Sequence, residues 1–143
     1  MPEVEFRNFT RTPLPEAGLR GYAARVMALI PGAAEESVEI VFTGKTRIRR
    51  LNAQYRRKNA PTDVLSFNVR TAGDGGPGPF GSIVICVPVA AENAKKSGAT
   101  LTEMLEELIL HSLLHLTGGD HETKAAHRAM ENRRRRIAAK LKG

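Results

Sequence analysis

The chain has 143 residues, 41% of them hydrophobic, which suits one globular domain, residues 1–143, with a substantial core. No run approaches the ~18 apolar residues of a membrane span, and the N-terminus lacks a signal-peptide layout, so we expect a soluble, cytoplasmic protein without a membrane partner. The single cysteine excludes an internal disulfide, and the net charge of +7, clustered in two stretches, points to a polyanionic partner.

The first half of the chain predicts two strands, each followed by a helix. Residues 3–9 alternate apolar and charged side chains, which is the period of a strand, and Leu14–Ile30 repeats apolar residues at helical spacing. Ser37–Thr43 alternates again, and a basic helix follows over about Lys45–Arg57. The predicted inward stripe of this helix is Ile48, Leu51 and Tyr55.

The second half predicts two strands and then three helices. The β-rich runs Pro61–Val69 and Gly81–Val87 flank a Gly- and Pro-rich stretch, Thr71–Pro79, which we expect to be a mobile loop at the edge of the site. The three helices are predicted over about Pro88–Lys96, Thr102–Leu116 and Glu122–Leu141. The second of these is apolar on nearly every side and should be buried. The order β-α-β-α-β-β-α-α-α therefore predicts an α+β fold, a small mixed sheet packed against helices around a central buried helix.

Three histidines on and after this central helix predict a metal site. His111 and His115 are four residues apart, so their side chains project from one face of the helix. Gly118 allows the chain to turn at the helix end and bring His121 back as a third ligand. Three neutral ligands leave a fourth position open, which is typical of catalytic zinc sites, although three imidazoles also suit nickel, cobalt or iron. The fourth histidine, His127, lies in a polar stretch and should be exposed.

The histidine spacing is also that of metzincin proteases, but the general base of those enzymes is missing. In them a glutamate follows the first histidine, and here the residue is Ser112, whose hydroxyl has no suitable pKa for a base. Glu107, one turn earlier, is a weaker candidate for a substitute base. Peptide hydrolysis is therefore disfavoured by the residues present.

The basic residues suggest a phosphodiester substrate instead. One cluster lies on the predicted helix and just after it, and the second is the arginine run at 133–136. A guanidinium can bind two phosphate oxygens in a fork and stabilise extra negative charge. The aromatic content of 5%, with no Trp, makes a base-stacking platform hard to assemble, so contacts to the phosphate backbone should dominate.

Three motifs together resemble the YbeY family of bacterial endoribonucleases and rRNA maturation factors. They are Leu51-Asn-Ala-Gln-Tyr55-Arg56, Pro61-Thr-Asp-Val-Leu-Ser-Phe67 and His111-x3-His115-Leu-x-Gly118-x-Asp120-His121. The resemblance implies an α+β fold, one Zn²⁺ on His111, His115 and His121, and cleavage of single-stranded RNA. It also implies a role in 16S rRNA 3′-end maturation and ribosome quality control.

The resemblance assigns further residues and partners. Arg56 matches the motif arginine beside the metal cleft and is, with His115, a predicted catalytic residue. The predicted RNA-binding residues come from the basic cluster on and after the predicted helix and are Arg49, Arg50, Arg56, Arg57 and Lys58. The implied partners are the 16S rRNA precursor, the small ribosomal subunit, and a ribosome-associated GTPase or a ribosomal protein.

The chain also departs from the family pattern at several positions. It has Ser112 where the family shows Gly, Gly119 for Tyr, Asn68 for Pro and Ser82 for a strand aspartate. The loss of the aspartate at Ser82 is expected to matter most, because a carboxylate near the cleft could position a ligand.

Two alternatives to an endoribonuclease stay open at this point. One is a metzincin-like metalloprotease. The other is a non-catalytic RNA-binding assembly factor with a structural metal, which needs a fourth protein ligand from Cys86 or Asp120. Cys86 lies in the apolar run Ile83–Val87, and we expect it to be a core residue.

Overall fold

The computed structural model describes residues 2–118 and 123–142. Its elements are β1 (Glu3–Asn8), α1 (Glu16–Ala28), β2 (Ser37–Thr43), α2 (Lys45–Arg56), β3 (Val64–Asn68), β4 (Gly81–Cys86), α3 (Val87–Ser97), α4 (Leu101–Gly118) and α5 (Lys124–Lys142). This order confirms the predicted succession of strands and helices. No helix in the described ranges is long and apolar enough to cross a membrane.

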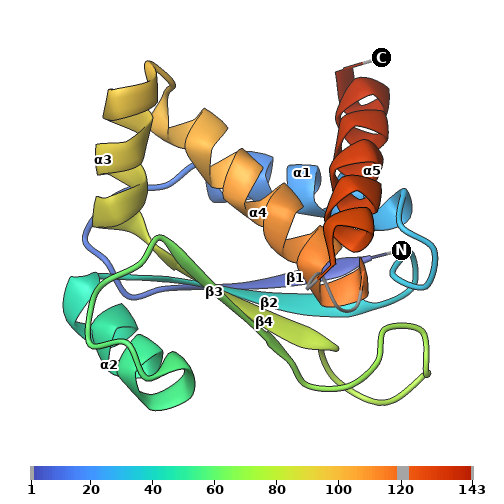
Figure 1. The fold of residues 1–143 in the computed structure, drawn as a ribbon, viewed down its shortest axis with the longest axis horizontal. Coiled ribbons are helices and arrows are strands. Elements are labelled where there is room, and N and C mark those ends of the chain that lie inside the picture. Colours follow the sequence, from blue (N-terminus) through green and yellow to red (C-terminus); the bar gives the residue numbers. More distant parts are fainter. Residues whose placement is uncertain (1, 119–122, 143) are drawn as a thin grey trace.

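The four strands form one mixed sheet in the order β1-β2-β4-β3. β1, β2 and β4 run parallel, whereas the edge strand β3 runs antiparallel to β4. Helices α1, α3, α4 and α5 lie on one side of the sheet and α2 lies on the other (Figure 1). Both faces of the central strands are therefore covered, which explains their almost continuous apolar sequences.

Two hydrophobic cores result from this layering. The larger core lies between the sheet and the helices on the side opposite α2, chiefly α1 and α4. The smaller core, under α2, consists of Val41, Ile48, Leu65, Val84 and Cys86. Cys86 is fully buried there, as predicted, and burial raises the pKa of its thiol.

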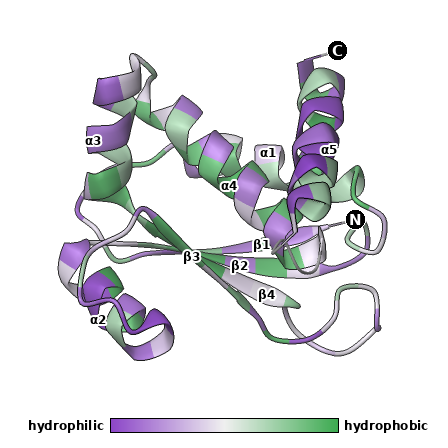
Figure 2. Cartoon of the chain, in the orientation of Figure 1, coloured by the Kyte–Doolittle hydropathy of each residue, from purple (hydrophilic) through white to green (hydrophobic). Residues whose placement is uncertain are grey.

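Helix α4 is the central helix of the larger layer. It packs on β3 and β4 and against α1, α3 and α5, and its buried residues are Leu105, Leu108, Ile109, Leu110, Ser112, Leu113, Leu114 and Leu116. In Figure 2 the hydrophobic residues gather on the strands and on α4, while α2 and α5 are largely hydrophilic. The sequence prediction of a buried central helix is confirmed.

One residue of the predicted α2 stripe does not face inward. Ile48 is buried and Leu51 is half-buried, but Tyr55 is 58% exposed. The buried polar residue is instead Asn52, whose side-chain amide donates to the carbonyl of Ala60 at 2.9 Å. The helix is thus rotated so that a polar side chain holds the loop that leads to β3.

The Gly- and Pro-rich loop between β3 and β4 is held by one arginine. Arg70 donates to both carboxylate oxygens of Glu36 at 2.7 Å and to Asp74 at 2.6 Å. The backbone N–H of Gly73 donates to the same Glu36 carboxylate at 2.7 Å. These bonds hold the pKa of Glu36 down at about 2. The loop is irregular, as predicted, and is attached to the sheet at these points.

Candidate active site

One face of α4 lines a cavity of about 260 Å³ between this helix, β3 and the end of α2. The residues that α4 contributes are Leu108, His111, Ser112 and His115. They are spaced at i, i+3, i+4 and i+7, which places them along one side of a helix. The rings of His111 and His115 stack with their centroids 6.3 Å apart, and both residues are exposed.

The opposite wall of the cavity comes from β3 and the loop before it. These segments contribute Thr62, Asp63, Val64 and Ser66. Ser66 and Val64 alternate with Leu65, which packs in the smaller core under α2, so they face α4. The motif Pro61–Phe67 therefore faces the histidine motif across the cavity.

Arg56 reaches this cavity from the last turn of α2. Its neighbour Tyr55 contacts the ring of Phe67 edge-on, with the ring centroids 5.0 Å apart. Helix α2 stops at Arg57, which adopts a left-handed conformation with φ 57°. The Tyr55 contact and the helix end thus hold Arg56 beside β3, and the three motifs meet at one cavity although they are far apart in the sequence.

The donor chemistry of the cavity fits a divalent transition metal. Two imidazoles four residues apart on one helix face are typical metal ligands. Residues 2–118 and 123–142 contain no cluster of three His, Cys, Asp or Glu able to hold a metal ion. They supply two of the three predicted ligands, and the third, His121, lies outside the described residues, as does Asp120.

Three other residues weighed as ligands or bases lie away from the cavity. Cys86 belongs to the core under α2. Glu107 lines a different cavity, beside α1 and α5, and accepts from Arg134 at 3.3 Å. His127 is exposed on α5, as predicted. Neither Cys86 nor Glu107 can therefore act on the cavity that His111 lines.

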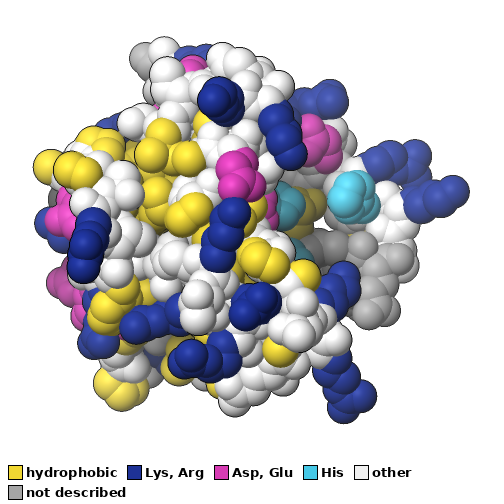
Figure 3. Space-filling model, turned by 90° about the vertical axis from the view of Figure 1, so that its left-hand side faces the viewer, with side chains coloured by type: hydrophobic (Ala, Val, Ile, Leu, Met, Phe, Trp, Pro, Cys, Tyr) yellow, Lys and Arg dark blue, Asp and Glu magenta, His cyan; other side chains and the backbone are white. Residues whose placement is uncertain are grey.

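The predicted RNA-binding residues are all exposed, on α2 or just after it: Arg49, Arg50, Arg56, Arg57 and Lys58. Figure 3 shows Lys and Arg side chains spread over this face of the molecule, with histidine side chains in a hollow among them. Two other basic residues of α2 are already engaged. Lys45 pairs with Glu92 at 2.6 Å, and Arg47 stacks on Phe9 with 4.0 Å between guanidinium carbon and ring centroid.

Ser82 and Ser112, two departures from the family pattern, lie in different surroundings. Ser82 pairs with Phe67 across the sheet and donates to Glu39 at 3.0 Å on the face that α2 covers. The expectation that this position affects the cleft is therefore wrong, because Ser82 lies on the opposite face of the sheet. Ser112 is 1% exposed, and its hydroxyl has no hydrogen-bond partner among the described residues.

The sequence interpretation missed Thr62, Asp63 and Ser66 as residues of the site. Asp63 brings a carboxylate to the cavity, and the hydroxyl of Thr62 donates to it at 3.4 Å. A signal was available, since all three residues belong to the motif Pro61–Phe67. Thr62 and Asp63 are polar residues directly before β3, and Ser66 lies on the face of that strand opposite to Leu65, so their positions in the motif could have identified them.

Comparison with known proteins gives one consistent family. The family model described as Endoribonuclease YbeY matches residues 12–142. Endoribonuclease YbeY of Geobacter metallireducens is 36% identical over 135 residues, which cover 92% of this chain and 89% of that protein. The protein of the same name from Alkalilimnicola ehrlichii is 36% identical over 142 residues, covering 97% and 86%.

A solved structure has the same fold. The solution structure of TM1509 from Thermotoga maritima aligns with a TM-score of 0.63 at 22% identity, covering 97% of this chain and 91% of that one. At this identity the likeness supports the α+β fold alone. Together with the family model and the relatives, it leads to one conclusion. The chain belongs to the YbeY endoribonuclease family and is a hydrolase.

Proposed function

We propose that this protein is a single metal-dependent domain that cleaves single-stranded RNA in the cavity between α4, β3 and α2. The observation that carries the proposal is the meeting of His111 and His115 from α4 with Arg56 from α2 in that one cavity. An imidazole pair offers ligands for a metal ion, and a guanidinium offers a fork for phosphate oxygens. Together they form a site for a phosphodiester.

In the proposed site His111, His115 and His121 hold one Zn²⁺. When bound, the ion supplies positive charge that stabilises the negative charge developing on the phosphate. Arg56 donates two N–H groups to nonbridging oxygens and holds the scissile group in place. The cavity also contains Asp63, whose carboxylate can accept a proton from a nucleophile or orient it, which are the roles of a general base.

The exposed cations on and after α2 are proposed to bind the phosphates on either side of the cut. Arg49, Arg50, Arg57 and Lys58 have no ion pair within the described part of the chain. Such contacts give affinity without reading the sequence. Choice of the cleavage position would then depend on a partner, which suits action on the 16S rRNA precursor in the small ribosomal subunit.

We further propose a place in ribosome biogenesis, in the cytoplasm, on the basis of the family. The substrate would be the 3′ end of the 16S rRNA precursor, and the process would include ribosome quality control. A ribosome-associated GTPase or a ribosomal protein would bring the enzyme to this end of the RNA.

The test is cleavage of a single-stranded RNA that carries the 3′ end of the 16S precursor. The native protein should cut it, a chelated sample should not, and His115→Ala should be inactive. His127→Ala is the matched control, because it removes an exposed histidine on α5 that lies outside the cavity, and it should cut like the native protein. Equal cutting by His115→Ala and native protein would reveal a contaminating nuclease and overturn the proposal.

The chemistry of the product ends distinguishes two routes. A 2′,3′-cyclic phosphate identifies attack by the neighbouring 2′-hydroxyl of the RNA, and a simple phosphate end identifies attack by water. Both products are compatible with the residues of the cavity, and Asp63→Asn should slow whichever route needs a base.

A further inference from the structure

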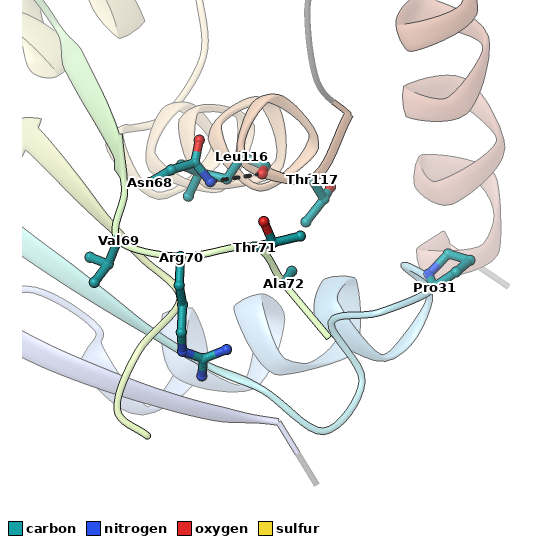
Figure 4. A pocket seen from close by; sticks show the side chains of 8 residues that line it. All are labelled: Pro31, Asn68, Val69, Arg70, Thr71, Ala72, Leu116 and Thr117. Atoms are coloured by element: carbon teal, nitrogen blue, oxygen red, sulfur yellow. Dashed lines mark hydrogen bonds between the residues drawn. The ribbon is translucent and has the colours of Figure 1, made fainter. Parts of the chain in front are cut away.

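A second cavity, of about 490 Å³, lies next to the cavity of the candidate active site, and it contains none of the histidines. It is lined by the segment that follows β3 and by the last residues of α4 (Figure 4). Residues Asn68, Thr71, Ala72, Leu116 and Thr117 are among its walls. Pro31, from the turn after α1, closes it on the far side.

The second cavity follows the first along the same two elements, β3 and α4. The first cavity is lined by residues 62–66 and by α4 up to His115, and the second is lined by residues 68–72 and by α4 from Leu116 onward. Ser66 lines the first cavity and Asn68 the second, and these residues are two apart on β3, so their side chains lie on one face of the strand about 7 Å apart. A single strand of RNA bound at the first cavity can therefore place its next nucleotide in the second.

The boundary between the two cavities is fixed by a hydrogen bond. The side-chain amide of Asn68 donates to the carbonyl of Leu116 at 3.0 Å, tying β3 to the last turn of α4. This bond also fixes the orientation of the amide, because only its nitrogen can donate to a carbonyl. A proline at this position, as in the family pattern, could not make the bond.

The charges around the second cavity exclude phosphate as its natural occupant. Arg70 lines it, but its side chain points away from α4 and its guanidinium is bound to Glu36 and Asp74 (Figure 4). No other Lys or Arg is among the described lining residues. A phosphate would meet no free cation here, whereas Arg56 is available at the first cavity. The second cavity suits a neutral group.

Its walls combine apolar surface with uncommitted hydrogen-bonding groups. Leu116, Ala72 and Pro31 supply the apolar surface. Thr71 points toward the end of α4 (Figure 4), and no hydrogen bond of its hydroxyl is found with any described residue. The hydroxyl of Thr117 donates to the carbonyl of Leu113 at 2.8 Å and can still accept a bond. A flat group with apolar faces and polar edges, such as a nucleobase, matches these walls.

We propose that the second cavity is a subsite for the base of the nucleotide next to the scissile phosphate. The inference rests on the proposed function, because it assumes that RNA is cut at the first cavity. Thr71 and Thr117 then contact the base edge, and Leu116 contacts a face. Because a base can present donors and acceptors to hydroxyl groups in either direction, the subsite requires a base without selecting one.

The test uses a short RNA that the native protein cuts at one position, and a set of copies in which one nucleotide at a time is made abasic. Loss of the base that occupies the subsite should reduce kcat/KM by about tenfold, the range expected for a few lost hydrogen bonds and contacts. Abasic substitution at more distant nucleotides should have little effect. If the native protein cleaves every abasic RNA with the same kcat/KM as the intact RNA, the inference is wrong.

A cavity-filling variant makes the test specific to this cavity. Thr71 is exposed, so a Trp at this position can place its ring in the subsite. The Thr71→Trp protein should cleave the intact RNA about tenfold more slowly than the native protein does. It should cleave the abasic RNA at the native rate, because the base that the ring displaces is already missing. Ala91→Trp, at an exposed position on α3, is the matched control and should keep the full effect of base removal. Thr71→Val removes the hydroxyl and keeps the size of the side chain, so it should reduce the effect of base removal only partly. This smaller substitution is the second test if the Thr71→Trp protein does not fold.

Two failures can be told apart. If Thr71→Trp keeps the full effect of base removal, the base binds elsewhere and the inference is wrong, while cutting that depends on His115 still supports the proposed function. If no cutting depends on His115, the proposed function itself fails. Affinity for the intact RNA, measured in a His115→Ala background that should not cut it, gives a second readout, and Thr71→Trp should weaken this affinity about tenfold.

Discussion

The two arginine-rich helices of this protein have similar compositions and different surroundings. On α2 and just after it, Arg49, Arg50, Arg57 and Lys58 are exposed and form no ion pair within the described ranges. On α5, Arg134 binds Glu131 at 2.8 Å and Glu107 of α4 at 3.3 Å, and Arg135 also binds Glu131.

The difference follows from the position of one acid. The segment 45–58 contains no Asp or Glu, so Arg49, Arg50, Arg57 and Lys58 have no acidic neighbour in their own segment and remain open to an external anion. Glu131, in contrast, lies three and four residues before Arg134 and Arg135 of α5. Arginine content therefore does not identify a nucleic-acid surface until the acidic neighbours have been counted. By this criterion we propose that α2 contributes to RNA binding, whereas part of the α5 run links α5 to α4 through Glu107.

The largest expected difference between the helices concerns a single arginine of each. Arg56→Ala should reduce kcat/KM for RNA cleavage by about 100-fold, because a charged donor aimed at the reacting phosphate is lost. Arg136→Ala removes an exposed arginine of α5 and should change the rate by less than about twofold. Steady-state cleavage of one RNA by both variants checks this, and equal losses would refute the division between the helices.

The next effect is on RNA affinity and its dependence on salt. Replacing Arg49, Arg50 and Arg57 together by Gln should weaken binding of single-stranded RNA about tenfold or more. It should also reduce the slope of log affinity against log salt by about two, at ~0.7 per phosphate contact. Binding titrations at several salt concentrations measure both quantities. An unchanged slope would mean that these side chains do not contact phosphate.

A smaller effect concerns stability and sharpens the role assigned to α5. Arg134→Met keeps the aliphatic packing of the side chain but removes its bonds to Glu131 and Glu107. The melting temperature should fall by about 1–4 °C, as expected for a partly exposed ion-pair network, while RNA affinity stays the same. Thermal unfolding followed by circular dichroism measures the first, and a fall in affinity without a change in melting temperature would reverse the assignment.

The last effect is the dependence of stability on pH. Bonds from Arg70 lower the pKa of Glu36 to about 2, and bonds from Arg134 do the same for Glu131. A carboxylate with a depressed pKa stabilises the fold above its ordinary pKa, and this stabilisation is lost as pH falls through the folded value. The stability difference between native protein and Glu36→Gln should therefore be full above pH about 4.5 and shrink toward pH 2. Denaturant unfolding across this range checks it, and a constant difference would exclude the pair as its source.

Much of the fold could be predicted from local patterns. The alternation in Ser37–Thr43 predicted the bounds of β2, and the helix predicted over about Pro88–Lys96 agrees with α3, which ends at Gly98 in the left-handed conformation that glycine favours. Such signals depend on residues close together in the sequence, because strand and helix periods are local. The burial of α4 was equally accessible, since apolar residues on every side of a helix leave it no face for water.

The errors arose where distant segments decide the outcome. Tyr55 was expected to face inward, but Phe67 of β3 offers its ring an exposed edge-on contact. Ser82 was expected to affect the cleft, yet the alternation of β4 puts it on the α2 face, and only the pairing of β4 with β3 reveals which face that is. The histidine pair could be predicted from its spacing in the sequence. That Arg56 and Asp63 line the same cavity as these histidines depends on how α2 and β3 pack, which no local pattern predicts.

The most direct measurement is the metal content of three purified variants beside the native protein, made together with their RNA cleavage rates. The native protein and His127→Ala should each bind one divalent ion per chain and cut RNA. His111→Ala and His121→Ala should bind it far more weakly and should not cut. Retention of a full metal ion and normal cleavage by His111→Ala would contradict the assignment of the active site to the histidine face of α4.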